Sequence, residues 1–560
     1  RQSPPARLAY HAQQAGMVHE AFHYLIQAGN EAMNMFAVQD AISSYKTSLS
    51  LLDKHQRMLS EADTDSIEDV KQLYWHLGRA YEVLEQWEQA GQVYENMLNF
   101  ARRIHQPKIA CIALNQRALL AIQQGFDIDR AIDLLQQAYT LVVERQDPRM
   151  EVEVAWSLAQ IFVHVWRLHE AERHGLRALE LARQLHLLEL EARSFFVLTE
   201  IYRWLGHYEQ TVDAATHAID LYTKLSAQTT LPPSLPTYIV VSGAMPSFQA
   251  TNQSALVGAL VTRFIGYVGL GNLQAALADG QRALSMSQAM KNISLQAWSL
   301  THLNHVFIEA GQYEAALRTA SQAHNLIHTS TNVLVRYYVL IVLGCSYQAL
   351  FQLEKAQDIL EEALALVQYA PSTEQQLLAT LWLSTNQALL GRWEQAATYA
   401  REALRLQEQT ETVLLPKGFA ATLPLVALLH VGDVAAAREM VQQSGAHVGT
   451  NPRTRTAYLH TRALLSQAQG EKAQAISDGQ EALQLANDLG LPGEQWLLQA
   501  MLGELYAQQG LHEREQEAMT QAAEILRRLA EQIQDDGLRA SFLAASQVRH
   551  ILEWHPDEEN

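Results

Sequence analysis

The sequence predicts an all-α protein built as a solenoid, a linear array of about thirteen helical hairpins. Two observations carry this prediction. Glycine and proline, the residues that most often interrupt helices, number only 27 and 14 among 560 residues, about 7% of the chain against roughly 12% in average proteins. A glycine-marked turn also recurs along the chain, at intervals that are mostly close to forty residues or a multiple of forty. A repeat of this length is typical of helical arrays rather than of compact domains.

Each repeat has the pattern of two helices joined by a short turn. The turn glycines are Gly206, Gly271, Gly311, Gly391, Gly432, Gly470 and Gly510. Apolar residues fall at helical spacing before and after each glycine, which predicts a hairpin. A small residue usually follows the glycine by five positions, and the aligned positions are Ala21, Ala41, Ala90, Ala131, Ala171, Thr211, Ala276, Ala316, Ala356, Ala396, Ala437, Ala475 and Glu515. Prolines should separate one hairpin from the next, as at Pro107, Pro148, Pro371, Pro416, Pro452 and Pro492.

These residues resemble the tetratricopeptide repeats. The resemblance is carried by three copies of the pattern: Leu77-Gly78, Tyr81, Ala90, Tyr94; Leu343-Gly344, Tyr347, Ala356, Leu360, Ala363; and Leu502-Gly503, Tyr506, Gly510, Met519, Ala522. It implies a right-handed α–α superhelix, that is, a tetratricopeptide-like solenoid. The period near forty exceeds the 34 residues of the standard repeat, which longer second helices would explain.

The chain divides into five predicted segments. Residues 1–53 form N-terminal helical hairpins, 54–222 and 254–533 form repeats, 223–253 form an inserted loop, and 534–560 form a capping helix and tail. The insertion contains Pro232, Pro233, Pro236 and Pro246 together with the β-like run Tyr238–Val241. It is either a spacer that packs over a repeat junction or a binding or self-association loop. Pro424 should kink its helix or mark the first turn.

Both ends of the chain resemble the helical arm of bacterial signalling ATPases of the STAND class. The motifs are Leu8-Ala9, Gly16, Ala21-Phe22, Tyr24-Leu25, Ala28, Ala41-Ile42 and Tyr45 at the start, and Leu538-Arg539, Phe542-Leu543, Val548 and Ile551-Leu552 at the end. The resemblance implies the C-terminal sensor or scaffold region of transcriptional regulators of the maltose-regulator-like and LuxR- or SARP-type. Such an arm follows a nucleotide-binding domain, and a chain that begins at Arg1 rather than Met is expected to be a piece of a longer protein.

The composition and motifs argue against several function classes. The net charge of −19 is the wrong sign for gripping phosphate backbones, so we expect no direct nucleic-acid binding. No P-loop occurs, which predicts no nucleotide cofactor in this chain. His169 and His174 lie five residues apart, about 140° around a helix, and do not suit a shared metal. We expect neither a cofactor nor a metal. The most apolar run, Tyr337–Leu350, is too short to span a membrane, and Cys111 and Cys345 suit a reducing cytoplasm.

The tetratricopeptide resemblance also implies a concave groove lined by particular positions. The reference point is the small residue of each first helix, here Gly78, Ala159 and Thr199. The groove positions lie three residues before it and one, four and five residues after it. The candidate partner-binding residues are Trp75, Arg79, Trp156, His164, Glu200, Arg203 and Trp204. Trp and Arg are favoured binding anchors. The alternative is that aromatic residues at helical spacing belong to the core.

The favoured function is a non-enzymatic interaction and sensing arm. It would bind a protein or peptide partner, or a small effector, in the groove and pass that event to attached signalling domains. A free-standing adaptor that assembles protein partners is the alternative. An enzyme with a site built on the groove is a remote third, because the sequence contains no catalytic motif and fold alone does not imply one.

Overall fold

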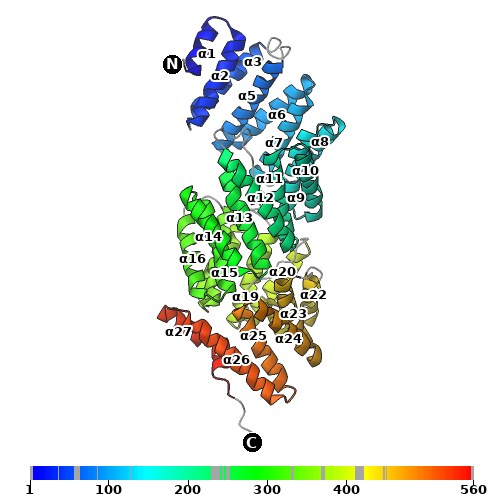
Figure 1. Ribbon diagram of the computed structural model, residues 1–560, viewed down its shortest axis with the longest axis vertical. Coiled ribbons are helices and arrows are strands. Elements are labelled where there is room, and N and C mark those ends of the chain that lie inside the picture. The colour runs from blue at the N-terminus through cyan, green and yellow to red at the C-terminus, as the bar shows by residue number, and fades with distance from the viewer. Residues whose placement is uncertain are drawn as a thin grey trace. The chain divides into compact units, whose positions relative to one another are not determined.

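The computed structural model describes residues 4–555 apart from residues 36, 56–63, 85, 126–127, 229–239, 242–244, 247–251, 329–332, 368–372, 410–421, 446–447 and 449–450. Apart from two short strands, the regular structure of the described residues is helical, and the helices run in antiparallel pairs (Figure 1). The chain separates into two compact units, unit 1 with residues 1–165 and 169–194 and unit 2 with residues 166–168 and 195–560. No described helix has the length and apolar character needed to cross a bilayer.

Unit 1 holds the first third of the chain. Its helices are α1 (Pro5–Gln14), α2 (Val18–Asn34), α3 (Val38–Lys54), α5 (Thr64–Val83), α6 (Trp87–Arg103), α7 (Pro107–Gly125), α8 (Ile128–Glu144), α9 (Pro148–His164) and α10 (Leu168–Gln184). Helix α11 (Leu188–Trp204) begins in unit 1 and ends in unit 2. Ala21 and Ala41, which the sequence assigns to separate repeats, lie on α2 and α3, the two helices of one hairpin.

Unit 2 holds the remaining helices. They are α12 (Tyr208–Gln228), α13 (Asn252–Gly269), α14 (Leu273–Ala289), α15 (Ile293–Glu309), α16 (Tyr313–Ile327), α17 (Val333–Ala349), α18 (Leu353–Val367), α19 (Thr373–Leu389), α20 (Trp393–Gln407), α21 (Leu423–His430), α22 (Val434–Gly445), α23 (Pro452–Ala468), α24 (Lys472–Leu489), α25 (Pro492–Ala507), α26 (His512–Glu531), α27 (Asp536–Ala544) and α28 (Ser546–Leu552). Pro424 lies in the first turn of α21.

The expected insertion at 223–253 is only partly described. Helix α12 continues to Gln228, so the first residues of that stretch are helical rather than loop. Two short strands follow, β1 (Val240–Val241) and β2 (Met245–Pro246), which pair antiparallel with Val240 opposite Pro246. The other residues of the insertion before α13 lie outside the described part of the chain.

The turns of the hairpins adopt the left-handed backbone that the glycine pattern predicts. All seven turn glycines have φ between 71° and 80°, a region that costs glycine little. Trp166 and Phe351 occupy the same turn position where a repeat lacks glycine, with φ of 60° and 53°. Both repeats therefore keep the turn geometry at the cost of some backbone strain.

Small residues let the two helices of a hairpin approach closely. A Cβ placed on Gly78 would lie 2.4 Å from Cζ of the Tyr94 ring, and one on Gly344 would lie 2.7 Å from Cδ2 of Leu360. The pattern residue Tyr94 is thus packed directly against the backbone of the first helix. This contact explains why the repeat motif has a small residue on the first helix and a larger one on the second.

The C-terminal helices α27 and α28 cover an apolar face. Phe542, Val548 and Ile551 are buried in one cluster with Leu526 of α26 and Tyr313 of α16. The end of the chain therefore packs on the last repeat and also on repeats more than 200 residues earlier in the sequence.

Candidate functional site: a polar cluster on the first helices of unit 2

The first helices of several hairpins in unit 2 bring five polar residues together. Glu200 and Arg203 come from α11, Thr262 from α13, Tyr338 from α17 and Glu374 from α19. Arg203 Nη2 donates to Glu200 Oε2 at 2.7 Å, and Thr262 Oγ1 donates to Glu200 Oε1 at 2.8 Å. Tyr338 donates its hydroxyl hydrogen to Glu374 Oε1 at 3.0 Å. We call these five residues the Arg203 cluster.

The Arg203 cluster holds one guanidinium and two carboxyl groups. Burial raises the pKa of Glu374 to about 7, against the lowering effect of its hydrogen bond from Tyr338 and of the Arg203 charge. The carboxylate of Glu200 adds to the increase. Burial also raises the pKa of Tyr338 well above its usual value, so the phenol keeps its proton. Near neutral pH the cluster therefore carries either a proton on Glu374 or an excess negative charge.

Aromatic side chains of unit 2 hold the tyrosine of this cluster in place. The Trp298 ring of α15 packs edge-on against Tyr338 with the centroids 5.4 Å apart. His302 packs against Trp298 at 4.5 Å and against Phe264 at 5.8 Å. Helices α13, α15 and α17 are thus joined through their side chains beside the polar contacts.

Three of the predicted partner-binding residues meet at this cluster. Glu200 is buried, whereas Arg203 and Trp204 are partly exposed. The Arg203 guanidinium lies 4.0 Å from the Trp204 ring centroid, and the Trp166 ring lies 4.7 Å from the same ring. Arg203 is therefore held between a carboxylate and an aromatic face, a geometry in which cation–π attraction adds to the ion pair.

In unit 1, Arg79 forms part of the hairpin interior. Its Nη1 donates to Glu82 Oε2 at 2.6 Å, and Glu82 Oε1 accepts the Tyr94 hydroxyl hydrogen at 2.7 Å. Burial raises the pKa of Glu82, against the effects of Arg79 and Tyr94. The buried guanidinium thus compensates a buried carboxylate, and only Trp75 of the predicted pair around Gly78 is partly exposed.

Trp156, also in unit 1, is a buried side chain with a satisfied ring nitrogen. Its indole N–H donates to the carbonyl oxygen of Arg193 at 3.2 Å, and the Arg193 guanidinium lies 4.3 Å from its ring centroid. Arg193 in turn pairs with Glu153 at 3.3 Å. These contacts fit the alternative that this tryptophan belongs to the core. His164 ends α9, and its side chain lies outside the described part of the chain.

The seven predicted residues thus fall in two units, each of which is described by itself. Within unit 2 the structure brings Glu200, Arg203 and Trp204 together; a single surface for all seven stays a prediction. Sequence reasoning missed Thr262, Tyr338 and Glu374. Tyr338 and Trp298 both lie six residues before Gly344 and Asn304, the positions of α17 and α15 that align with Gly78, Ala159 and Thr199. Extending the register to that position would have found them, but no such pattern marks Thr262 or Glu374.

The histidine and cysteine side chains that a metal or thiol site would require instead make packing contacts within the fold. His174 stacks on Phe162 at 5.6 Å, and burial lowers its pKa to about 4. Among the described residues no group of three or more His, Cys, Asp or Glu side chains could hold a metal ion. Cys111 and Cys345 are buried, and burial raises the pKa of both thiols, which makes them poor nucleophiles.

In comparisons with known proteins, the chain is similar to several solved structures. No protein-family model matches the chain, and no curated protein matches it. The APC/C hetero-tetramer Cut9-Hcn1 has 14% identity, a TM-score of 0.49 and 95% coverage of both chains. The quorum sensor NprR from B. thuringiensis has 17% identity, a TM-score of 0.46 and coverage of 70% of this chain and 99% of its own.

A third similar structure is a signal-transduction ATPase with numerous domains and a tetratricopeptide repeat sensor from Pyrococcus horikoshii. It has 16% identity and a TM-score of 0.38, and the match covers 66% of this chain and 52% of that one. Similarity at this level concerns the arrangement of helices alone. The hairpins themselves, with their left-handed turns and their small residues packed against Tyr94 and Leu360, make the chain a tetratricopeptide-like helical array.

Proposed function

We propose that the chain is the interaction and effector-sensing arm of a larger bacterial signalling or transcription-regulatory protein, working in the cytoplasm without catalysis of its own. The observation that carries the proposal is the Arg203 cluster. Four first helices, α11, α13, α17 and α19, each contribute a side chain to it. A partner that engages this cluster therefore acts on several hairpins at once.

Arg203 and Trp204 are the residues through which we expect a partner to bind. Both are partly exposed, and their stacked pair presents a charged group beside an aromatic face. A carboxylate of a protein or peptide partner, or of a small effector, would compete with Glu200 for the Arg203 guanidinium. Because Glu200 also accepts from Thr262, such competition changes the contact between α11 and α13. A partner that binds one packing of these helices more tightly than another would shift the population toward that packing, and this shift would be the signal.

The partner site is tested by photo-crosslinking at position 204. A photoreactive phenylalanine analogue replaces Trp204 in the full chain, in the cells that produce the protein, and a matched variant carries it at Ile293, an exposed apolar residue of the same unit. We expect one defined crosslinked product at position 204 and none at position 293. The same product at both positions, or none at either, would contradict a binding surface at Trp204.

A paired measurement then separates binding from folding. Trp204→Ala should weaken binding of the crosslinked partner by about thirtyfold, or about 2 kcal/mol, as at an interface hot spot, with little change in the melting temperature. Ala171→Leu should do the reverse, because Ala171 is fully buried and overpacking costs roughly 1–3 kcal/mol of stability. A large loss of stability in Trp204→Ala without a specific binding defect would make Trp204 a core residue.

The signalling context is tested separately from the binding surface. A P-loop encoded within a few hundred residues upstream of Arg1 would support the signalling arm, whereas a start codon directly before Arg1 would favour a free-standing adaptor. ATP turnover that co-elutes with residues 1–560 would contradict the absence of catalysis.

A further inference from the structure

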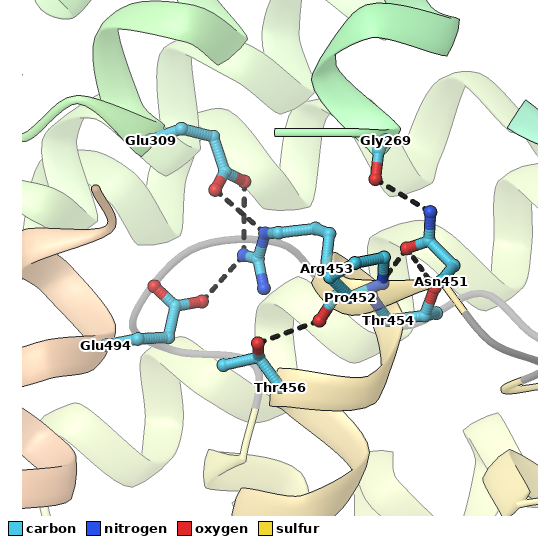
Figure 2. A network of polar contacts seen from close by, with 8 residues as sticks. All are labelled: Gly269, Glu309, Asn451, Pro452, Arg453, Thr454, Thr456 and Glu494. Carbon is cyan, nitrogen blue, oxygen red and sulfur yellow. Dashed lines mark hydrogen bonds and ion pairs between the residues drawn. The ribbon is translucent and has the colours of Figure 1, made fainter. Parts of the chain in front are cut away.

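A buried ion-pair triad joins helices of unit 2 that are far apart in the sequence. Arg453, at the start of α23, donates from Nε and Nη2 to both carboxylate oxygens of Glu309 in α15, at 2.9 and 3.1 Å. The same Nη2 donates to Glu494 Oε1 of α25 at 2.6 Å. Figure 2 shows the guanidinium lying between the two carboxylates. All three side chains are buried.

Asn451 lies beside the triad and makes a second connection. Its Nδ2 donates to the carbonyl oxygen of Gly269, at the end of α13, at 2.9 Å (Figure 2). Its Oδ1 accepts a hydrogen bond from the backbone N–H of Thr454, so that Asn451 caps the N-terminus of α23. The start of α23 is therefore fixed to the ends of both α13 and α15.

Packing contacts and hydrogen bonds also join the C-terminal helices of unit 2 to the earlier hairpins of the same unit. Leu489 packs against Gly271, and Leu529 and Pro492 pack against Gly311. Gln352 donates to Ser541, and Glu314 accepts from the backbone N–H groups of Gln534 and Asp535. The C-terminal hairpins α23/α24 and α25/α26 thus rest on the turns of the hairpins α13/α14 and α15/α16. The triad is the charged, buried part of this contact.

The charge of the triad is unbalanced. Two carboxyl groups share one guanidinium, so the fully ionised triad holds an excess negative charge away from water, which is costly. The groups facing Glu494 are Arg453, Glu309 and, from α16, Tyr313, while Tyr208 of α12 faces Arg453, Glu309 and Arg203. Of the two guanidinium groups, Arg453 is the one that donates hydrogen bonds to both carboxylates. Burial, together with the Glu309 charge, raises the pKa of Glu494, against the lowering effect of Arg453.

We propose that the Glu309–Arg453–Glu494 triad is a proton-dependent latch that holds the C-terminal hairpins of unit 2 on hairpins α13/α14 and α15/α16. The latch is closed when the Glu494 carboxyl group carries a proton, and it loosens when that proton is lost. Once the hairpins separate, water solvates both carboxylates and the penalty disappears. The inference rests on this geometry and is independent of the proposed partner site.

The direction of the pH dependence follows from the raised pKa of Glu494. A carboxyl group whose pKa is higher in the closed state stabilises that state fully below its usual pKa, and this contribution is lost as the pH rises through the raised value. Each unit of difference corresponds to a tenfold change in the ratio of open to closed molecules. We therefore expect opening between pH 5.5 and pH 8.5.

The test measures the distance between α14 and α24 in the full chain. Spin labels at Ser285→Cys and Ser477→Cys, both exposed positions, report this distance by double electron–electron resonance. The protein without these substitutions should take up no label, because Cys111 and Cys345 are buried. We expect a single narrow distance distribution at pH 5.5 and a ratio of open to closed molecules at least about tenfold higher at pH 8.5. An unchanged distance distribution would overturn the proposal without any further variant.

Three substitutions assign the pH dependence to the triad. Glu494→Gln leaves Arg453 paired with Glu309 alone and should stay closed at both pH values. Glu481→Gln, which removes a half-exposed partner of Arg455 on the neighbouring helix, should keep the wild-type opening. Glu374→Gln should also keep it. Opening that survives Glu494→Gln, or that disappears in Glu374→Gln instead, would overturn the latch.

Discussion

At the scale of single residues, arginine–glutamate pairs that are buried or nearly so occur in both units. Arg79 pairs with Glu82 in unit 1, and Arg203 with Glu200 in unit 2, each at a spacing of three residues along one helix. Exposed pairs with the same spacing also occur, as between Arg405 and Glu402. The two kinds differ in energy because a buried charge that loses its partner is left in a medium of low polarity. Identical sequence spacing therefore conceals different contributions to stability.

Arg79→Ala should strongly destabilise its hairpin, whereas Arg405→Ala should not. The Arg79 and Glu82 side chains are 7 and 1% exposed, against 56 and 45% for Arg405 and Glu402. Removing one partner of a buried pair costs about 3–5 kcal/mol, whereas water screens an exposed pair, so that its loss changes stability little. Hydrogen exchange followed by mass spectrometry should show faster exchange in α5 and α6 of Arg79→Ala and unchanged exchange in α20 of Arg405→Ala. Equal effects would show that burial does not set the strength of these pairs.

At the scale of helices and hairpins, the repeat depends on two backbone features. The left-handed residue ends the first helix, and the small residue of that helix accepts the side chain of the second helix. Trp166 and Phe351 show that the turn position tolerates other residues at some strain. The packing position is stricter at Gly78 and Gly344, where an added Cβ would overlap Tyr94 or Leu360.

Gly344→Ala should destabilise α17/α18 although alanine favours helices. Replacing glycine by alanine within a helix ordinarily gains roughly 0.5–1 kcal/mol, but here the new methyl group would lie 2.7 Å from Leu360. Overpacking of this kind costs roughly 1–3 kcal/mol. The measurement is a double-mutant cycle with Leu360→Ala, read from hydrogen exchange in the two helices. The glycine substitution should cost less, or become favourable, when Leu360 is shortened, and additive effects would contradict direct contact.

At the scale of the whole molecule, contacts between distant segments complete the second unit. Phe542 of α27 packs with its ring centroid 6.1 Å from that of Tyr313 and 5.7 Å from that of Phe351. Val548 and Ile551 of α28 are buried in the same cluster. Because each hairpin of a repeat array normally contacts only its neighbours, these contacts make the repeats α15–α18 depend on the end of the chain.

Phe542→Ser should loosen helices α16–α18, and Leu543→Ser should not. Phe542 is 2% exposed and its sequence neighbour Leu543 is 37% exposed, so the two substitutions differ mainly in the buried contact that is lost. Truncating a buried phenylalanine typically costs about 3–5 kcal/mol. Faster hydrogen exchange in α16–α18 of Phe542→Ser, about 200 residues from the substitution, would show the dependence. An effect confined to α27 and α28 would show that the terminal helices only cover the last repeat.

The sequence by itself determined the helical class, the period and the positions of the turns. These follow from local physics: glycine at the left-handed turn, proline at the first turn of α7, α9, α23 and α25, and apolar residues at helical spacing. The same register pointed to Glu200, Arg203 and Trp204, since it fixes which residues share one face of a helix. It also counted Ala21 and Ala41 as separate repeats, although they lie twenty residues apart, half a period, which is the spacing between the two helices of one hairpin.

Only the tertiary structure decided which of the marked residues are buried and what they meet. Glu374 and Tyr338 join the Arg203 cluster from helices more than 130 residues away, and Arg453 meets Glu309 across 144 residues. Local sequence patterns do not predict such pairs. Each hairpin is rotated slightly relative to the one before it, and the sum of these rotations over many hairpins decides which distant repeats come into contact. For the same reason Trp156 and Arg79 share the groove register of Trp204 but lie in the interior of their unit.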